Sequence, residues 1–157
     1  MSEKKVEYWS AERSTEVRDS FARQEAMHLI QASMPVLEKG EVEIHMPHWK
    51  GVGQQHGFVH GGVVGMIADS AGGYAAMTVA PPGTSVLTVE YKLNFLAPAK
   101  GDKLIARGAV IKAGRRLIVT EARVWACEGS RETLCAVMQQ TIMAIKEPEQ
   151  KSGEHDK

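Results

Sequence analysis

The sequence has no excess of charge and few cysteines, and each shortage excludes a class of protein. Lysine and arginine together number 19, as do aspartate and glutamate, so the formal net charge is zero. Because a nucleic-acid-binding protein needs a basic surplus to neutralise phosphates, we expect no nucleic-acid partner. The two cysteines, Cys127 and Cys135, are too few for a disulfide framework in a chain of 157 residues. We expect both to be reduced residues of the core.

Long apolar runs are also missing. No run reaches the roughly 18 residues that a membrane span requires, and the four residues after Met1 are polar or charged, without an apolar signal region. We therefore expect a cytoplasmic protein with no membrane segment. The length and the 43% hydrophobic content suit one domain with a proper core. We divide the chain into a flexible arm at 1–13, one domain at 14–146 and a disordered polar tail at 147–157.

The spacing of apolar residues predicts the first helix and the first strand. Residues 14–32 show helical spacing, with Ser14 as the N-cap, and Pro35 lies beyond the end of this helix. Residues 42–46 alternate between apolar and polar side chains and predict a strand.

A second helix, predicted at residues 61–79, is the element around which we expect the others to fold. It is apolar on nearly every side and carries a single charge, Asp69. A helix that is hydrophobic all round is buried. Its many small residues favour the close approach of a sheet or of a partner helix, and the Pro-Pro-Gly sequence at 81–83 prevents the helix from continuing.

Four longer strands are predicted after this helix, joined by short turns, which favours an antiparallel meander. In the first of them, strict alternation puts Leu87, Val89, Leu93 and Phe95 on one face and Thr88 on the other. The predicted class is therefore α+β, with one five-stranded antiparallel sheet curled around one apolar helix. The four ranges are 84–96, 103–112, 116–128 and 132–145.

Asp69 and the start of the apolar helix are the two candidate sites of chemistry. An ionised carboxylate inside an apolar helix is unfavourable unless it is paired, hydrogen-bonded or solvated at a cleft, so Asp69 indicates either a functional cleft, an exposed stripe or a structural hydrogen bond. His60, Gly61 and Gly62 open the helix. Free backbone N–H groups at a helix N-terminus, with glycines beside them, can bind an oxyanion or a polarised carbonyl, although a glycine pair also suits a simple turn.

Helix geometry separates these two features. Gly61 and Asp69 are eight residues apart, which corresponds to about 12 Å along a helix. That distance is too long for an oxyanion donor and a base that act on the same carbonyl. Either the two serve different purposes, or a twofold axis brings Asp69 of one subunit to Gly61 of another. A symmetric dimer with two composite sites is the economical arrangement.

Other chemistries have less support. The G-x-S-x-G elbow and the phosphate-binding loops GxxxxGK[ST] and GxGxxG are absent. Four histidines invite interpretation as a metal site, but no carboxylate or cysteine lies among them. We expect no metal and no cofactor. The four are His45, His48, His56 and His60.

Taken together, these motifs resemble the hotdog-fold acyl-CoA thioesterases of the PaaI type, in the 4-hydroxybenzoyl-CoA thioesterase superfamily. The resemblance rests on Gln54, the His60-Gly61-Gly62 sequence, Asp69 and the stretch 88–99, and it runs from about Phe21 to Ile145. It implies a hotdog fold, in which a curved five-stranded antiparallel sheet wraps one long central helix, with an N-terminal helix beside it. It also implies a homodimer whose sheets join, and a dimer of dimers as the assembly.

The resemblance assigns a role to each candidate residue. The backbone N–H of Gly61 polarises the thioester carbonyl, and Asp69 of the other subunit acts as general base on water or as nucleophile. Gln54 stands where relatives often have Asn and places the thioester or the water. His60 orients the loop, and the hydroxyl of Thr88 positions the attacking water.

The resemblance also implies where the substrate lies. Coenzyme A is part of the substrate rather than a separate cofactor, and its phosphates suit basic residues at a hairpin tip. The expected contacts are Gly62, Ala97, Pro98, Ala99, Lys100, Lys112, Gly114, Arg115 and Arg116.

Two other functions remain open from the sequence. One is a non-catalytic acyl-CoA-binding or regulatory protein of the same fold. The other is an assembly protein in which Asp69 is purely structural. The acyl group is not determined, because Phe58, Met66 and Met77 could line its pocket or belong to the core.

Overall fold

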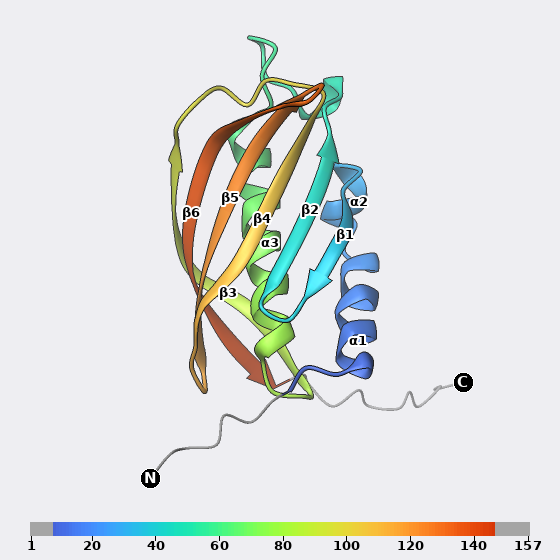
Figure 1. Ribbon diagram of the computed structural model, residues 1–157, viewed down its shortest axis with the longest axis vertical. Coiled ribbons are helices and arrows are strands. Elements are labelled where there is room, and N and C mark those ends of the chain that lie inside the picture. The colour runs from blue at the N-terminus through green and yellow to red at the C-terminus, as the bar shows by residue number, and fades with distance from the viewer. Residues whose placement is uncertain (1–7, 147–157) are drawn as a thin grey trace, which may run out of the picture.

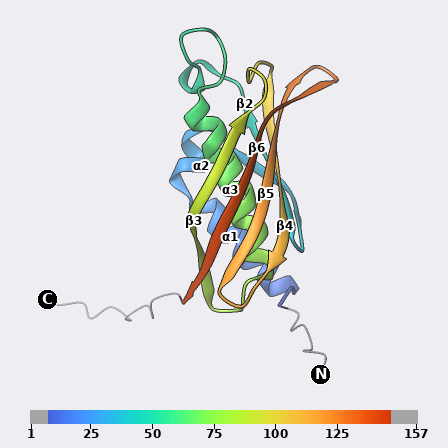
Figure 2. The ribbon, with the colours of Figure 1, turned by 90° about the vertical axis from the view of Figure 1, so that its left-hand side faces the viewer.

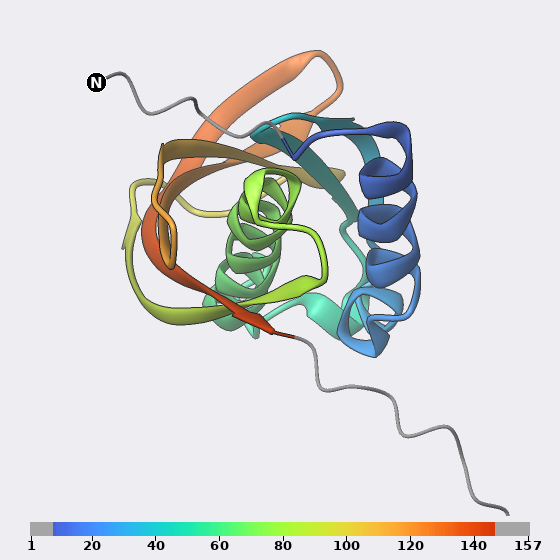
Figure 3. The same ribbon diagram turned by 90° about the horizontal axis from the view of Figure 1, so that it is seen from below.

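The central helix, α3 (Gly61–Val79), lies in the concave side of a curved sheet, with α1 (Ala11–Ala22) and α2 (Glu25–Leu29) packed beside it (Figures 1 and 3). The structure is a computed structural model that describes residues 8–146. Residues 1–7 of the predicted arm and the predicted tail at 147–157 lie outside the described residues. The strands are β1 (Ser33–Glu38), β2 (Glu41–Pro47), β3 (Thr84–Phe95), β4 (Lys103–Ala113), β5 (Leu117–Glu128) and β6 (Arg131–Lys146), and a short 3-10 helix, η1, spans Lys50–Val52.

The sheet has the order β1-β2-β4-β5-β6-β3, and every neighbouring pair is antiparallel. The expected α+β class and the sheet wrapped around one long helix are therefore confirmed. The strand count is six instead of the predicted five, because β1 forms a hairpin with β2 that turns at Gly40, where φ is +80°. Pro35 lies past the end of α2, as expected, and belongs to β1, an edge strand, where proline is tolerated.

The N-terminal helix differs from the prediction in its bounds. The single helix expected at 14–32 is two helices, and its N-cap is Ser10, whose Oγ accepts from the backbone N–H of Arg13 at 3.1 Å. On one continuous helix, Ile30 would point about 140° away from Val17, at 3.6 residues per turn. Because both side chains are buried, the break between α1 and α2 lets both helices face the core.

The helix and the sheet approach each other closely at two glycines. A Cβ atom on Gly108 of β4 would lie 2.3 Å from the backbone oxygen of Ala71. A Cβ atom on Gly72 of α3 would lie 1.7 Å from Oε1 of Gln140. Both distances are far below van der Waals contact, so the small residues of this helix do serve the close approach of the sheet.

Arg13 ties α1 to the end of the central helix. Its guanidinium is buried and donates from Nε to the backbone oxygen of Met77 at 3.0 Å and from Nη2 to that of Thr84 at 3.2 Å. The carbonyls of the last helical turn have no partner within their own helix. Arg13 satisfies one of them and fixes α1 against α3.

A β-bulge changes which residues of β3 face the helix. The register with β6 shifts between Thr88 and Glu90, and one extra residue reverses the in-and-out alternation. Thr88 therefore faces the helix together with Leu93 and Phe95, which lie beside Gly65 and Gly61. The prediction that Thr88 lies on the opposite face from Leu93 and Phe95 is wrong, since strict alternation ignores the bulge.

Within residues 8–146, no helix is long and apolar enough to cross a membrane.

Candidate active site

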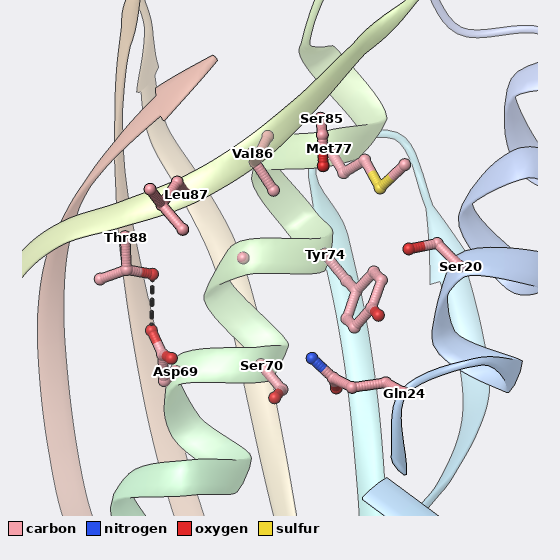
Figure 4. A pocket seen from close by; sticks show the side chains of 11 residues that line it. Ser20, Gln24, Asp69, Ser70, Tyr74, Met77, Ser85, Val86, Leu87 and Thr88 are labelled. Atoms are coloured by element: carbon pink, nitrogen blue, oxygen red, sulfur yellow. Dashed lines mark hydrogen bonds between the residues drawn. The ribbon is translucent and has the colours of Figure 1, made fainter. Parts of the chain in front are cut away.

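Asp69 occupies the middle of α3, where two side chains from the sheet bind the same oxygen of its carboxylate. Oδ1 accepts from Oγ1 of Thr88 at 2.7 Å (Figure 4). It also accepts from Nε2 of Gln140 at 2.7 Å. Gln140 is buried, and its Nε2 also donates to the backbone oxygen of Asp69 at 3.1 Å, while its Oε1 accepts from Thr120 at 3.1 Å. This chain of bonds fixes the position and the orientation of the carboxylate.

The second carboxylate oxygen of Asp69, Oδ2, is available to act as a base or a nucleophile. No hydrogen bond from the described part of the chain reaches Oδ2 of Asp69. Asp69 is partly exposed and borders a cavity of about 440 Å³. Such an oxygen, held in place and open to a cavity, can accept a proton from water or attack an electrophilic carbon. The cavity lies between α1, α3 and β3, and its other lining residues are Ser20, Gln24, Ser70, Gly73, Tyr74, Met77, Ser85, Val86, Leu87 and Thr88.

At the N-terminus of α3, the backbone N–H of Gly61 has no acceptor among residues 8–146. His60 is the N-cap, and its Nδ1 accepts from the N–H of Gly62 at 2.9 Å. The N–H groups of Val63 and Val64 both donate to the backbone oxygen of His60, at 2.9 and 3.1 Å. The N–H of Gly61 donates to no described residue. It adds to the partial positive charge of the helix end, as an oxyanion donor does.

Gln54 lies in the loop before the helix. Its Oε1 accepts from the backbone N–H of His56 at 2.7 Å, which closes a local turn and leaves the amide nitrogen Nε2 as its donor group. Gln54 and Gly61 line a second cavity of about 420 Å³, with Phe58 and the loop that follows β3. The other residues that line it are Val59, Val64, Phe95, Leu96, Ala97, Pro98 and Ala99.

The two groups of candidate residues thus lie in two separate cavities of one protomer. Asp69 and Thr88 line the first, and Gln54 and Gly61 line the second. Met77 lines the first and Phe58 the second, whereas Met66 lines neither.

The residues expected to bind coenzyme A lie at both ends of the sheet. The loop at 97–100 belongs to the end that carries the second cavity, where Val59 donates to the backbone oxygen of Ala99 at 2.9 Å. The β4–β5 hairpin, which carries Lys112, Gly114, Arg115 and Arg116, lies at the opposite end (Figure 1). One protomer does not bring them together.

Three of the four histidines have separate partners, and the fourth is exposed. His45 contacts Glu43 at 3.1 Å, His48 contacts the backbone oxygen of Gly101 at 2.9 Å, and His60 caps α3. His56 is exposed in the loop. Residues 8–146 contain no group of three or more His, Cys, Asp or Glu side chains arranged to hold a metal ion.

Gln140 is the residue of this site that the sequence interpretation missed. It occupies an inward position of β6, two residues from Met138 and from Ile142, which are both buried. A buried amide in an otherwise apolar inward row needs a polar partner. That pattern is visible in the sequence, and it could have pointed to Asp69.

The comparisons with known proteins agree with the fold and with the activity of a thioester hydrolase. A family model described as "Thioesterase superfamily" matches residues 56–133, the range that includes His60, Gly61, Asp69 and Thr88. A Saccharolobus solfataricus protein named "Putative esterase" is 32% identical over 85% of this chain and 86% of its own length.

Solved structures give the same result. A thioesterase family protein from Silicibacter pomeroyi is 43% identical, covers 86% of this chain and 99% of its own, and superposes with a TM-score of 0.84. The PaaI protein of E. coli, from the phenylacetic acid degradation operon, is 17% identical over 86% of this chain and 95% of its own, with a TM-score of 0.75, and shows the likeness of the fold. The chain therefore belongs to the thioesterase superfamily, with the hotdog fold and the activity of a thioester hydrolase.

Proposed function

We propose that the protein is an acyl-CoA thioesterase whose active site is shared between two subunits. Asp69 of one subunit acts through Oδ2, as general base on water or as nucleophile. The free N–H of Gly61 in the partner subunit polarises the thioester carbonyl and stabilises the oxyanion. The observation that carries the proposal is the placement of a fixed carboxylate and a free helix-terminal N–H in two separate cavities.

The edge of the sheet supports the sharing of the site. Within residues 8–146, β3 pairs with β6 on one side, and no strand pairs with its other side (Figure 2). Leu87, Val89, Tyr91 and Phe95 are each more than half exposed, as is Leu96 just beyond the strand. An open edge with exposed apolar residues is a template for pairing with another strand. We therefore propose that β3 pairs with β3 of a second subunit and joins the two sheets.

The register of that pairing follows from the positions of the two half-sites. Thr88 bonds Asp69, and Phe95 lies against Gly61, where a Cβ atom would meet its ring at 3.1 Å. An antiparallel β3–β3 pair in which Lys92 lies opposite the partner's Lys92, with Val89 unpaired at the bulge, sets Thr88 of one subunit opposite the partner's Phe95. Asp69 of one subunit then faces the partner's Gly61, and the twofold axis makes two such sites.

The same pairing supports the proposed coenzyme A contacts. It brings the β4–β5 hairpin end of one subunit toward the loop end of its partner, where Ala97 to Lys100 lie. Lys112, Arg115 and Arg116 are all exposed, so they are free to contact phosphate groups. Both cysteines are free thiols, which suits a reducing compartment such as the cytoplasm. We expect a homodimer that pairs further into a dimer of dimers.

The test is a thiol-release assay with acyl-CoA esters on an Asp69→Asn variant. Asparagine keeps the oxygen that accepts from Thr88 and Gln140, and it replaces Oδ2 with an amide that is neither base nor nucleophile. We expect the same oligomer by light scattering and a kcat lower by about 10²–10⁴-fold, the usual contribution of a general base. Asp19→Asn, on the exposed face of α1, is the control and should keep wild-type turnover. Hydrolysis at the wild-type rate by Asp69→Asn would refute the assignment.

A further inference from the structure

A threonine hydroxyl lies buried on the inner face of β5, in a row of apolar side chains. Thr120 is fully buried, and the residues two positions before and after it, Ile118 and Ala122, are buried as well. Thr120 pairs with Gln140 directly across the β5–β6 ladder, and its Oγ1 donates to Oε1 of Gln140 at 3.1 Å. Thr120 lines neither of the two cavities, so it does not touch a molecule bound in either of them.

The carboxamide of Gln140 uses all of its hydrogen-bonding groups in one orientation. Nε2 carries two hydrogens, and both point to Asp69, where Nε2 donates to the backbone oxygen at 3.1 Å and to Oδ1 at 2.7 Å. Oε1 accepts from Thr120 and from no other residue in the described part of the chain. If the carboxamide turned over, Oε1 would face two oxygens of Asp69 with no hydrogen between them. The orientation that serves Asp69 therefore leaves Oε1 dependent on Thr120.

The stability of the fold does not require this polar pair. Two apolar side chains of the same shape at positions 120 and 140 would be about as stable, because the cost of burying polar groups offsets most of the gain from bonding them. The central helix also leaves little room for another arrangement, since a Cβ atom on Gly72 would lie 2.8 Å from Oγ1 of Thr120. A buried polar pair whose bonds end at a reactive carboxylate is explained by its effect on that carboxylate.

We propose that Thr120 is a positioning residue of the active site, which acts on Asp69 through Gln140. The proposal rests on the proposed function, in which Asp69 is the reacting group. The Thr120 hydroxyl satisfies Oε1 in the orientation that directs both Nε2 hydrogens to Asp69. Without that hydroxyl, Oε1 is a buried acceptor without a donor, and other positions of the carboxamide compete with the one that holds the carboxylate. A carboxylate that is held less well reacts more slowly.

The first test is the kinetics of Thr120→Val, which keeps the shape of the side chain and removes the hydroxyl. We expect kcat to fall by about tenfold, the effect of one unmet buried hydrogen bond. KM should stay unchanged, because Thr120 does not contact the substrate. Thr120→Ser retains the hydroxyl and should keep a kcat close to that of the wild-type protein. Thr141→Val makes the same change at the residue after Gln140, whose hydroxyl donates to Glu90 at 3.1 Å, and it should keep the wild-type kcat. A wild-type kcat in Thr120→Val would overturn the proposal, and so would a Thr120→Ser variant as slow as Thr120→Val.

A double-mutant cycle separates positioning from packing. If Thr120 acts through Gln140, then Thr120→Val should lower kcat by about tenfold in the wild-type background and should have no effect on kcat in the Gln140→Met background. A residue that serves only the packing of the sheet would lower kcat by the same factor in both backgrounds. Equal factors in the two backgrounds would therefore contradict the positioning role.

NMR spectroscopy tests the positioning without any measurement of turnover, and so separates it from the proposed function. The side-chain NH₂ signals of Gln140 are identified by their absence in Gln140→Met. They should exchange with D₂O about tenfold faster in Thr120→Val than in the wild-type protein or in Thr120→Ser. If Asp69→Asn hydrolyses acyl-CoA at the wild-type rate, the proposed function fails, and faster exchange in Thr120→Val still supports the hold of Thr120 on Gln140. An exchange rate that Thr120→Val leaves unchanged would overturn that hold.

Discussion

The contact between Gly72 and Gln140 gives a prediction about two neighbouring glycines. In Gly72→Ala the new Cβ would lie 1.7 Å from Oε1 of Gln140 and 2.8 Å from Oγ1 of Thr120, so the carboxamide must move away from Asp69. In Gly73→Ala the new Cβ would meet nothing within 4 Å. The two variants make the same chemical change in the same helix, and only the first disturbs the bonds that hold Asp69.

The two substitutions should change the free energy of unfolding in opposite directions. Replacing glycine by alanine inside a helix stabilises by about 1 kcal/mol, and Gly73→Ala should show that gain. In Gly72→Ala the overlap costs about 1–3 kcal/mol and the lost bonds to a charged group about 1.5–3 kcal/mol. The net effect is a destabilisation of about 1.5–5 kcal/mol, or a melting temperature lower by roughly 3–20 °C for a chain of this length.

The assay is thermal and urea unfolding of the wild-type protein and both variants at one protomer concentration, because oligomers melt at temperatures that depend on concentration. The kcat of Gly72→Ala should also fall by about tenfold or more, since its carboxylate is no longer held in place. If Gly72→Ala is as stable and as active as Gly73→Ala, then Gln140 does not position Asp69 as described.

Three further predictions test other parts of the structure. Thr88→Val keeps the shape of the side chain and removes one donor to Asp69, so kcat should fall by about tenfold with KM little changed; an unchanged kcat would show that this bond is dispensable. Arg13→Met removes the bond to the carbonyl of Met77 and should lower the free energy of unfolding by about 2–4 kcal/mol in urea titrations, and equal stability would contradict the anchoring role of α1. Burial raises the pKa of the Cys135 thiol to about 11, so it should not react with a thiol reagent at pH 8 until urea unfolds the chain, and stability should fall as the pH rises above about 9, because the unfolded thiol ionises first. Rapid labelling of the native protein at Cys135 would contradict that burial.

The sequence predicts the central helix and the positions of both half-sites for clear physical reasons. A lone carboxylate in an apolar helix and a glycine pair at its N-terminus are local features, so both can be recognised in the sequence without knowledge of the fold. The rise of the helix then separates Gly61 from Asp69 by about 12 Å, and in the structure the two residues line different cavities.

The features that could not be predicted depend on contacts between distant segments. The bulge in β3 is defined by its pairing with β6, which the sequence of β3 does not show. Alternation along β3 alone therefore places Thr88 on the wrong face. The split between α1 and α2 follows from the need to bury both Val17 and Ile30 against the same core. Gln140 carries a signal in its own strand, but its partner Asp69 lies 71 residues away in the chain.

The claim that two subunits share each active site is tested most directly by mixing two inactive variants. Asp69→Ala removes the carboxylate, and Gly61→Val places a side chain in the second cavity, against Phe95. Each variant alone should be inactive. After unfolding and refolding of an equal mixture, half of the dimers are mixed, and each mixed dimer has one intact shared site, so about a quarter of the wild-type activity should return. If each site lay within one subunit, every site in the mixture would carry a defect, and no activity would return.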